Sequence, residues 1–155
     1  MGRAVAITAV VCAALLGCGG NSQFRDLTAP YVGTWIIDSG TDTATCPGST
    51  TTAPVTGSVI VNLGAEPLML QVRDTNHGRC VWTLAVSAAS ATLRDGPSCL
   101  ASTATSDATV VPRDYQMTLT AASSQATVTS TFDWTILDTT CRHAQQEHLV
   151  FMRTP

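Results

Sequence analysis

The second half of the chain alternates between apolar and polar residues with a period of two. In the segment from Gln125 to Asp138, every second residue is mostly apolar and the intervening residues are mostly threonine. Successive side chains of a β-strand point to opposite faces, so this pattern predicts a long strand with one buried and one wet face. A shift of one residue would bury a row of threonines and an aspartate. We therefore expect Val128, Phe132 and Trp134 to point inward.

Earlier segments repeat this alternation, and turn-forming sequences separate them. The runs Gly64–Pro67 and Asp74–Gly78 are strong turn sequences between segments rich in valine, leucine and threonine. No window of a dozen residues from Cys18 onward shows a convincing helical period. We expect eight or nine strands, at residues 32–38, 52–63, 68–73, 79–87, 91–94, 105–111, 115–121, 126–137 and 145–152.

Most of these predicted strands are joined by short turns, which indicates an antiparallel up-and-down meander. A meander of this length avoids exposed edges when it closes into a barrel. We therefore predict an all-β domain over residues 31–155 that forms a closed or nearly closed barrel. A two-sheet β-sandwich is the alternative architecture.

The start of the chain predicts export. Arg3 precedes an apolar run at residues 4–16, and small residues follow, as in a secretory signal. As a helix this run would span about 20 Å, which is short of the roughly 30 Å hydrocarbon core of a bilayer. The run ends in Leu15-Leu16-Gly17-Cys18, which resembles the lipobox of bacterial lipoproteins. An ordinary signal peptide with an incidental cysteine is the alternative.

The lipobox resemblance implies three segments. Residues 1–17 would be a signal peptide, Cys18 would be acylated, and residues 18–30 would form the anchor and a flexible tether. The membrane is then a partner through the lipid. Gram-negative lipoproteins that lack Asp directly after the acylated cysteine are sorted onward, so Gly19 implies the outer membrane. We expect a lipid-anchored protein of the cell envelope.

Four cysteines follow the predicted anchor, at Cys46, Cys80, Cys99 and Cys141. An even number in an exported chain argues for two disulfides, and three connectivities are possible. We favour Cys80–Cys99, which would bridge neighbouring strands, and Cys46–Cys141, which would join the two ends of the sheet. Zinc is the competing interpretation, but no C-x-x-C pair occurs, so we expect no metal site.

Composition and motifs argue against several functions. The chain has no lysine, its arginines are scattered and its net charge is −3, so we expect no nucleic-acid partner. His143, Glu147 and His148 do not match H-E-x-x-H, and we interpret them as polar residues on the outer face of the last strand. His77 we interpret as a solvated turn residue. We predict no catalytic residues and no cofactor, and we do not expect an enzyme.

The motif Gly33-Thr34-Trp35 resembles the G-x-W signature of the lipocalins and the wider calycin barrels. In that superfamily the tryptophan closes one end of the barrel, and a basic residue near the last strand packs across its ring. The resemblance implies that Trp35 and Arg153 form such a cation–π pair. The lipobox, the early G-T-W and the spaced cysteines together also resemble the Thr- and Ser-rich lipoproteins of high-GC Gram-negative bacteria.

These features predict a non-enzymatic, lipid-tethered barrel with a pocket for a small hydrophobic ligand or a face for a protein partner. The alternative is an inhibitor of a cell-wall hydrolase or protease, because small lipid-anchored barrels of this shape include lysozyme inhibitors. A lined cavity of several hundred Å³ would favour ligand binding. A filled interior with a protruding loop would favour inhibition.

Replacing Cys18 by serine tests the anchor. We expect the Cys18→Ser protein to become water-soluble, because a hydroxyl does not accept the lipid, and the native protein to lack residues 1–17. Intact-mass analysis and detergent phase partitioning measure both effects. Cys12→Ser is the matched control, since Cys12 lies inside the apolar run and has no predicted role. A Cys18→Ser protein that stays firmly bound to membranes would contradict the lipobox interpretation.

Overall fold

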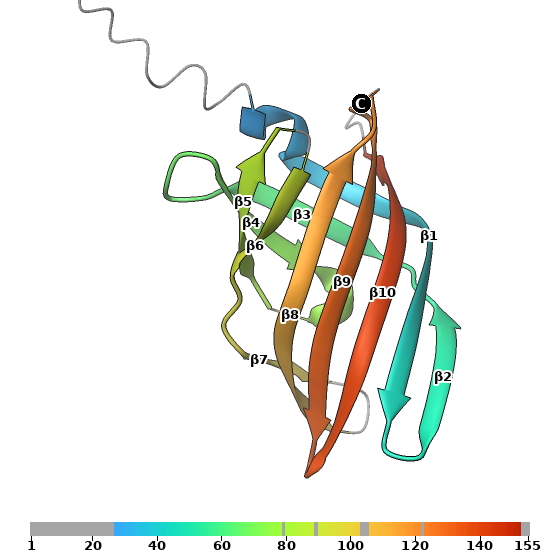
Figure 1. The fold of residues 1–155 in the computed structure, drawn as a ribbon. Coiled ribbons are helices and arrows are strands. Elements are labelled where there is room, and N and C mark those ends of the chain that lie inside the picture. The colour runs from blue at the N-terminus through green and yellow to red at the C-terminus, as the bar shows by residue number, and fades with distance from the viewer. Residues whose placement is uncertain (1–26, 79, 89, 103–105, 122, 153–155) are drawn as a thin grey trace, which may run out of the picture.

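The structure is a computed structural model that describes residues 27–78, 80–88, 90–102, 106–121 and 123–152. These residues form ten β-strands and two short 3₁₀-helices, η1 (Ala29–Tyr31) and η2 (Thr75–His77) (Figure 1). The strands are β1 (Gly33–Cys46), β2 (Ser49–Pro54), β3 (Ser58–Leu63), β4 (Met69–Asp74), β5 (Trp82–Ser87), β6 (Ser90–Asp95), β7 (Cys99–Ser102), β8 (Asp107–Leu119), β9 (Gln125–Ile136) and β10 (Thr139–Phe151).

Eight of the strands close into an antiparallel barrel. Their order around the ring is β1, β3, β4, β5, β6, β8, β9 and β10, and β10 pairs with β1 to complete it. The other two strands lie outside the ring, where β2 forms a hairpin with the second half of β1 and β7 pairs with the first half of β8. The predicted all-β closed barrel is confirmed, and the sandwich alternative is not the fold.

The long strand β1 joins the barrel wall to the hairpin outside it. Its first half pairs with β3, its second half pairs with β2, and β10 pairs with both halves. The register between β1 and β10 shifts between Ile37 and Ser39, so Asp38 is the extra residue of a β-bulge. Beyond the bulge Gly40 lies opposite Glu147, and the two strands continue together to their cysteines.

Several strands differ from the predicted ones. The predicted strand at 52–63 is divided into β2 and β3, whereas those at 105–111 and 115–121 are one strand, β8, with a register shift at Arg113. The short strand β7 was not predicted, and β1 and β10 extend further toward their cysteines. Every residue of β2 is exposed, so its sequence carries no alternation between a buried and a wet face. The period-two pattern could not reveal such strands.

Large side chains fill the interior of the barrel. On β9, Val128 and Phe132 are buried as predicted, and Trp134 is partly buried with its ring against that of His77 inside the barrel. The inward face predicted for this strand is therefore confirmed. The largest fully buried apolar side chains around the ring are Trp35, Trp82, Tyr31, Tyr115, Phe132, Leu70, Leu84, Met117 and Leu149.

Two disulfides join the pairs that the sequence favoured. Cys46 and Cys141 link the ends of β1 and β10, with their Cα atoms 4.3 Å apart. The Cα atoms of Cys80 and Cys99 are 5.6 Å apart. The reason given for this second pair was wrong, because Cys80 precedes β5 whereas Cys99 begins β7, and these strands are not neighbours in the sheet. This bridge instead ties the outer strand β7 to the barrel wall.

Trp35 lies inside the barrel beside η1. It is fully buried, its indole Nε1 donates a 2.8 Å hydrogen bond to the carbonyl oxygen of Tyr31, and its ring lies 5.0 Å from that of Phe151. Arg153 lies outside the described residues, so its contact with Trp35 stays a prediction. Thr28, within the segment expected as tether, is 3% exposed and packs with this end of the fold.

Gly33→Ala tests how tightly this end is packed. Gly33 has φ +141°, and an added Cβ would lie 2.6 Å from the ring of Phe151, which Trp35 holds in place. We expect a loss of about 2–4 kcal/mol in the free energy of unfolding, measured by urea denaturation. Gly48→Ala is the control, because Gly48 also has positive φ but open space around it, and we expect it to cost about 1 kcal/mol. Equal losses in the two variants would contradict this packing.

Candidate functional site

The helix η2 turns into the barrel rather than out toward solvent. Its N-terminus is capped by Asp74, whose Oδ1 accepts a 2.8 Å hydrogen bond from the backbone N–H of Asn76. His77 is fully buried, so the prediction that it is solvated was wrong. Its ring lies against three aromatic rings, with centroids 4.1 Å from Phe132, 5.2 Å from Trp82 and 5.8 Å from Trp134.

The inner face of β10 carries polar side chains. Glu147 is 4% exposed and faces inward, so the prediction that it lies on the outer face was wrong, and His143 shares its face. Only His148 lies outside, near the exposed Asp38. Glu147 and His143 have the same parity in the strand as the buried Leu149, and this signal could have placed them inward from the sequence.

A pocket of about 350 Å³ lies between η2 and strands β1, β9 and β10. It is lined from β1 by Asp42, from η2 by Asn76, from β9 by Trp134 and from β10 by His143 and Gln145. Residues 53–56, at the end of β2 and beyond it, form the remaining wall. We call this site the η2 pocket.

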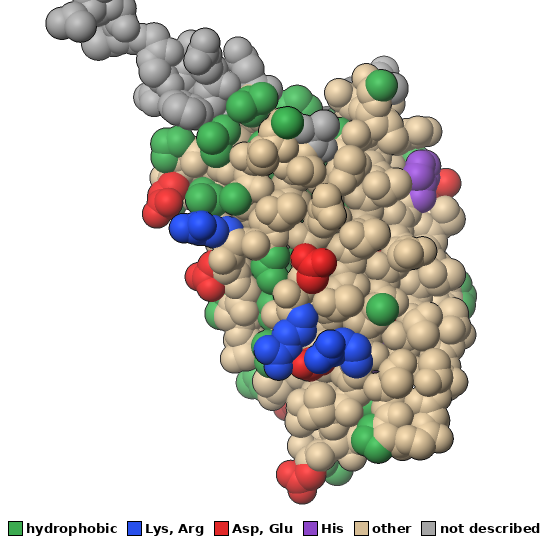
Figure 2. Space-filling model, viewed as in Figure 1, with side chains coloured by type: hydrophobic (Ala, Val, Ile, Leu, Met, Phe, Trp, Pro, Cys, Tyr) green, Lys and Arg blue, Asp and Glu red, His purple; other side chains and the backbone are tan. Residues whose placement is uncertain are grey.

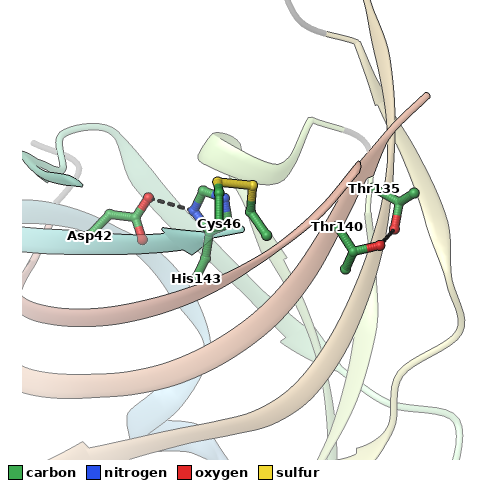
Figure 3. The surroundings of a disulfide bond; sticks show 6 residues. Asp42, Cys46, Thr135, Thr140 and His143 are labelled. Atoms are coloured by element: carbon green, nitrogen blue, oxygen red, sulfur yellow. Dashed lines mark hydrogen bonds and ion pairs between the residues drawn. A yellow bond between two sulfur atoms is a disulfide. The ribbon is translucent and has the colours of Figure 1, made fainter. Parts of the chain in front are cut away.

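The side chains of Asp42 and His143 are hydrogen-bonded across the seam between β1 and β10. The Nδ1 atom of His143 lies 2.8 Å from Oδ2 of Asp42, close to the Cys46–Cys141 disulfide (Figure 3). The imidazole ring also packs at 5.2 Å against that of Trp134. The carboxylate on one side and the indole on the other therefore fix the orientation of the imidazole.

Four buried polar atoms of the residues that line the η2 pocket have no hydrogen-bond partner among the described residues. Two are acceptors, Asp42 Oδ1 and Gln145 Oε1, and two are donors, Asn76 Nδ2 and Trp134 Nε1. Leaving a buried polar group unpaired costs about 1–3 kcal/mol, and native proteins pair most such groups. Neighbouring atoms cover all four, so a small molecule that both donates and accepts hydrogen bonds would pair them once these side chains turn into the pocket.

More polar groups lie deeper in the barrel. Burial, and then the carboxylates of Asp74 and Asp42, raise the pKa of Glu147 from 4.5 to about 8. Burial, followed by Asp74 and Glu147, raises the pKa of Tyr115 well above 10.0. His77 Nδ1 lies 3.4 Å from Asp74 Oδ2. The phenol and these carboxylates are thus close enough to affect one another.

The arginines of the described chain lie outside the barrel. Arg113 and Arg142 both pair with Asp133 on the outer face of β8–β10, where Figure 2 shows the charges gathered amid largely uncharged surface. The hydrogen bond from Arg142 and then that from Arg113 lower the pKa of Asp133, against the opposing effect of its burial. Neither guanidinium is directed at the carboxylates inside.

The described residues hold no group of three or more His, Cys, Asp or Glu side chains placed to bind a metal ion. Within the same residues no helix is long and apolar enough to cross a membrane. Comparison of the chain with protein-family models, characterised proteins and solved structures finds no match. The function of the η2 pocket is therefore argued from its own geometry.

Glu147→Gln tests the buried carboxyl through the pH dependence of stability. Between about pH 4.5 and 8 the folded protein keeps Glu147 protonated, whereas the unfolded chain has released that proton. Its contribution to stability is thus complete below pH 4.5 and falls as pH rises toward 8, by at most about 1.4 kcal/mol per unit. We expect the variant to lose this slope, so that its stability relative to wild type increases with pH.

Urea denaturation of both proteins at several pH values measures the difference, and every other titrating group is common to the two. Glu66→Gln, at an exposed turn, is the control and should follow the wild-type curve. Parallel curves for the wild type and Glu147→Gln would contradict the raised pKa.

Proposed function

We propose that the chain is a lipid-anchored protein of the bacterial cell envelope whose barrel binds a small polar ligand in the η2 pocket. The lipobox-like Leu15-Leu16-Gly17-Cys18 supports the anchor and, with Gly19, the outer membrane as its location. The observation that carries the binding proposal is the set of four unpaired buried polar atoms around one pocket of about 350 Å³.

The packing of the barrel favours a polar ligand over the hydrophobic one expected from lipocalin-like barrels. Trp82, Phe132 and His77 occupy the space that an apolar ligand would need in the middle of the barrel. The lining of the η2 pocket offers amide, carboxylate, imidazole and indole groups. Its volume is near the lower limit for ligand sites, which argues for a small molecule.

The arrangement of the pocket favours binding over catalysis. The Asp42–His143 pair has the form of the base and its orienting acid in hydrolases. No serine, threonine or cysteine in the described part of the chain makes a hydrogen bond to His143 that would activate it as a nucleophile. The indole of Trp134 covers part of the imidazole instead. We therefore assign the pair to ligand recognition.

Filling the pocket tests the proposal. We expect at least one compound from a set of small polar molecules to shift the indole N–H signal of Trp134 in NMR spectra, with the signal assigned through Trp134→Phe. Ala53→Trp should abolish the shift, because Ala53 lines the pocket and the new ring would fill it. Thr50→Trp is the control, on the same exposed strand but outside the lining. The proposal fails if no compound shifts the signal, or if Ala53→Trp binds as the wild type does.

Inhibition of a cell-wall hydrolase or protease is the second candidate, and the β9–β10 hairpin supports it. Leu137 at its tip is 90% exposed and has φ +52°. The hairpin is braced by a 2.9 Å hydrogen bond between the hydroxyls of Thr135 and Thr140 and by the disulfide at Cys141 (Figure 3). A rigid tip with an exposed leucine suits insertion into an active-site cleft. Inhibition of lysozyme or of a protease that Leu137→Asp abolishes would favour this candidate.

A further inference from the structure

The barrel interior next to the η2 pocket holds three carboxyl groups and two imidazoles. Asp42, Asp74 and Glu147 lie close enough that the first two raise the pKa of the third. One imidazole accompanies Asp42 and another accompanies Asp74. Both carboxyl oxygens of Glu147 are buried without a hydrogen-bond partner, and its side chain is nine-tenths buried. The described residues therefore leave carboxyl oxygens unpaired in this part of the interior.

The residues that the structure describes supply no stronger cation to this region. The sequence contains no lysine, and the described arginines are all exposed. An anionic ligand would meet the repulsion of Asp42 at the pocket wall and of Asp74 behind it. A metal ion is also disfavoured, because the described residues hold no group of side chains placed to bind one. An organic cation remains the ligand class that fits the charge.

The two free acceptors of the pocket lie side by side. Asp42 and Gln145 are directly opposite each other in the β1–β10 ladder, and each has one buried oxygen without a partner. Residues opposite each other in an antiparallel pair have Cβ atoms about 4.5–5.5 Å apart. An ammonium group has several N–H donors that diverge from one nitrogen, so it can bond to both oxygens at once.

The aromatic and donor groups complete the match. The indole ring of Trp134 lines the pocket, and the faces of such rings attract cations. The free donors, Asn76 Nδ2 and Trp134 Nε1, need an oxygen acceptor on the ligand. A plain alkylamine would leave these donors unpaired, whereas an amino alcohol or an amino sugar would pair them.

We infer that the η2 pocket binds a small organic amine that also carries a hydroxyl or carbonyl oxygen. The ammonium group bonds to Asp42 Oδ1 and Gln145 Oε1, and the oxygen accepts from Asn76 and Trp134. This inference rests on the proposed function, because it assigns a ligand class to the same pocket. It adds the requirement that the ligand is positively charged.

The test compares amines with neutral molecules of the same skeleton. Calorimetric titration of the folded barrel uses glucosamine against N-acetylglucosamine, and ethanolamine against ethylene glycol. We expect each amine to bind about tenfold or more tightly than its neutral counterpart, since hydrogen bonds to charged groups are the stronger ones. Binding of the amines should weaken at high salt.

Asp42→Asn should weaken amine binding about tenfold or more and weaken the binding of neutral compounds much less. Asp38→Asn is the matched control, on the same strand but exposed outside the barrel, and should bind as the wild type does. If Asp42→Asn does not fold, Gln145→Met removes the second acceptor without changing the charge and should also weaken amine binding.

The outcomes separate this inference from the proposed function. Neutral or anionic compounds that bind as well as amines, and that Ala53→Trp excludes, would overturn the cationic ligand but leave the pocket as a ligand site. If no compound of any class binds, the proposed function fails as well. Amine binding that survives both Asp42→Asn and Ala53→Trp would place the amine elsewhere and overturn the inference.

Discussion

The pairing of β1 with β10 is the constraint on which the rest of the structure depends. It closes the ring, so β1 and β10 lose the free edges that they would present in an open sheet. It also decides which side chains meet inside, because it sets Asp42 opposite Gln145 and Gly40 opposite Glu147. A shift of one residue in the β1–β10 register would turn the polar inner row of β10 out to solvent, and the η2 pocket would not form. The Cys46–Cys141 disulfide fixes the register at the end where the pocket lies.

The sequence predicts those strands that have one buried face and one solvent-exposed face. The alternation of residues along β9 predicted its inner face, and the short turns between successive segments predicted the closed barrel. The cysteines at the two ends of the predicted sheet likewise indicated their partners. Prediction failed for strands that are exposed on both faces, such as β2, because no burial contrast marks their residues.

The candidate site escaped prediction for the opposite reason. His77 and Glu147 are polar residues at buried positions, and polarity alone assigns such residues to solvent. The local sequence of Asp74–Gly78 does not determine whether this turn folds outward or into the barrel. That direction depends on the space left between strands that are distant in sequence. The only sign in the sequence that Glu147 faces inward is that it lies two residues before the apolar Leu149, on the same face of the strand. The polarity of Glu147 itself indicates the opposite. Polar residues at positions that the alternation assigns to the buried face of a strand are therefore candidate functional residues.

The closure of the ring by its first and last strands has a consequence for how the molecule is made. Trp35 pairs with Phe151, so the seam joins residues near the two ends of the domain. Contacts so distant in sequence are slow to form, and none of this seam can form before the last strand is available. If the chain crosses a membrane from its N-terminus, the hairpins from β3 to β9 can assemble as they emerge. Until β10 follows, the edge of β1 that pairs with β10 stays unpaired. The barrel, and with it the pocket between β1 and β10, would be completed only after β10 has emerged.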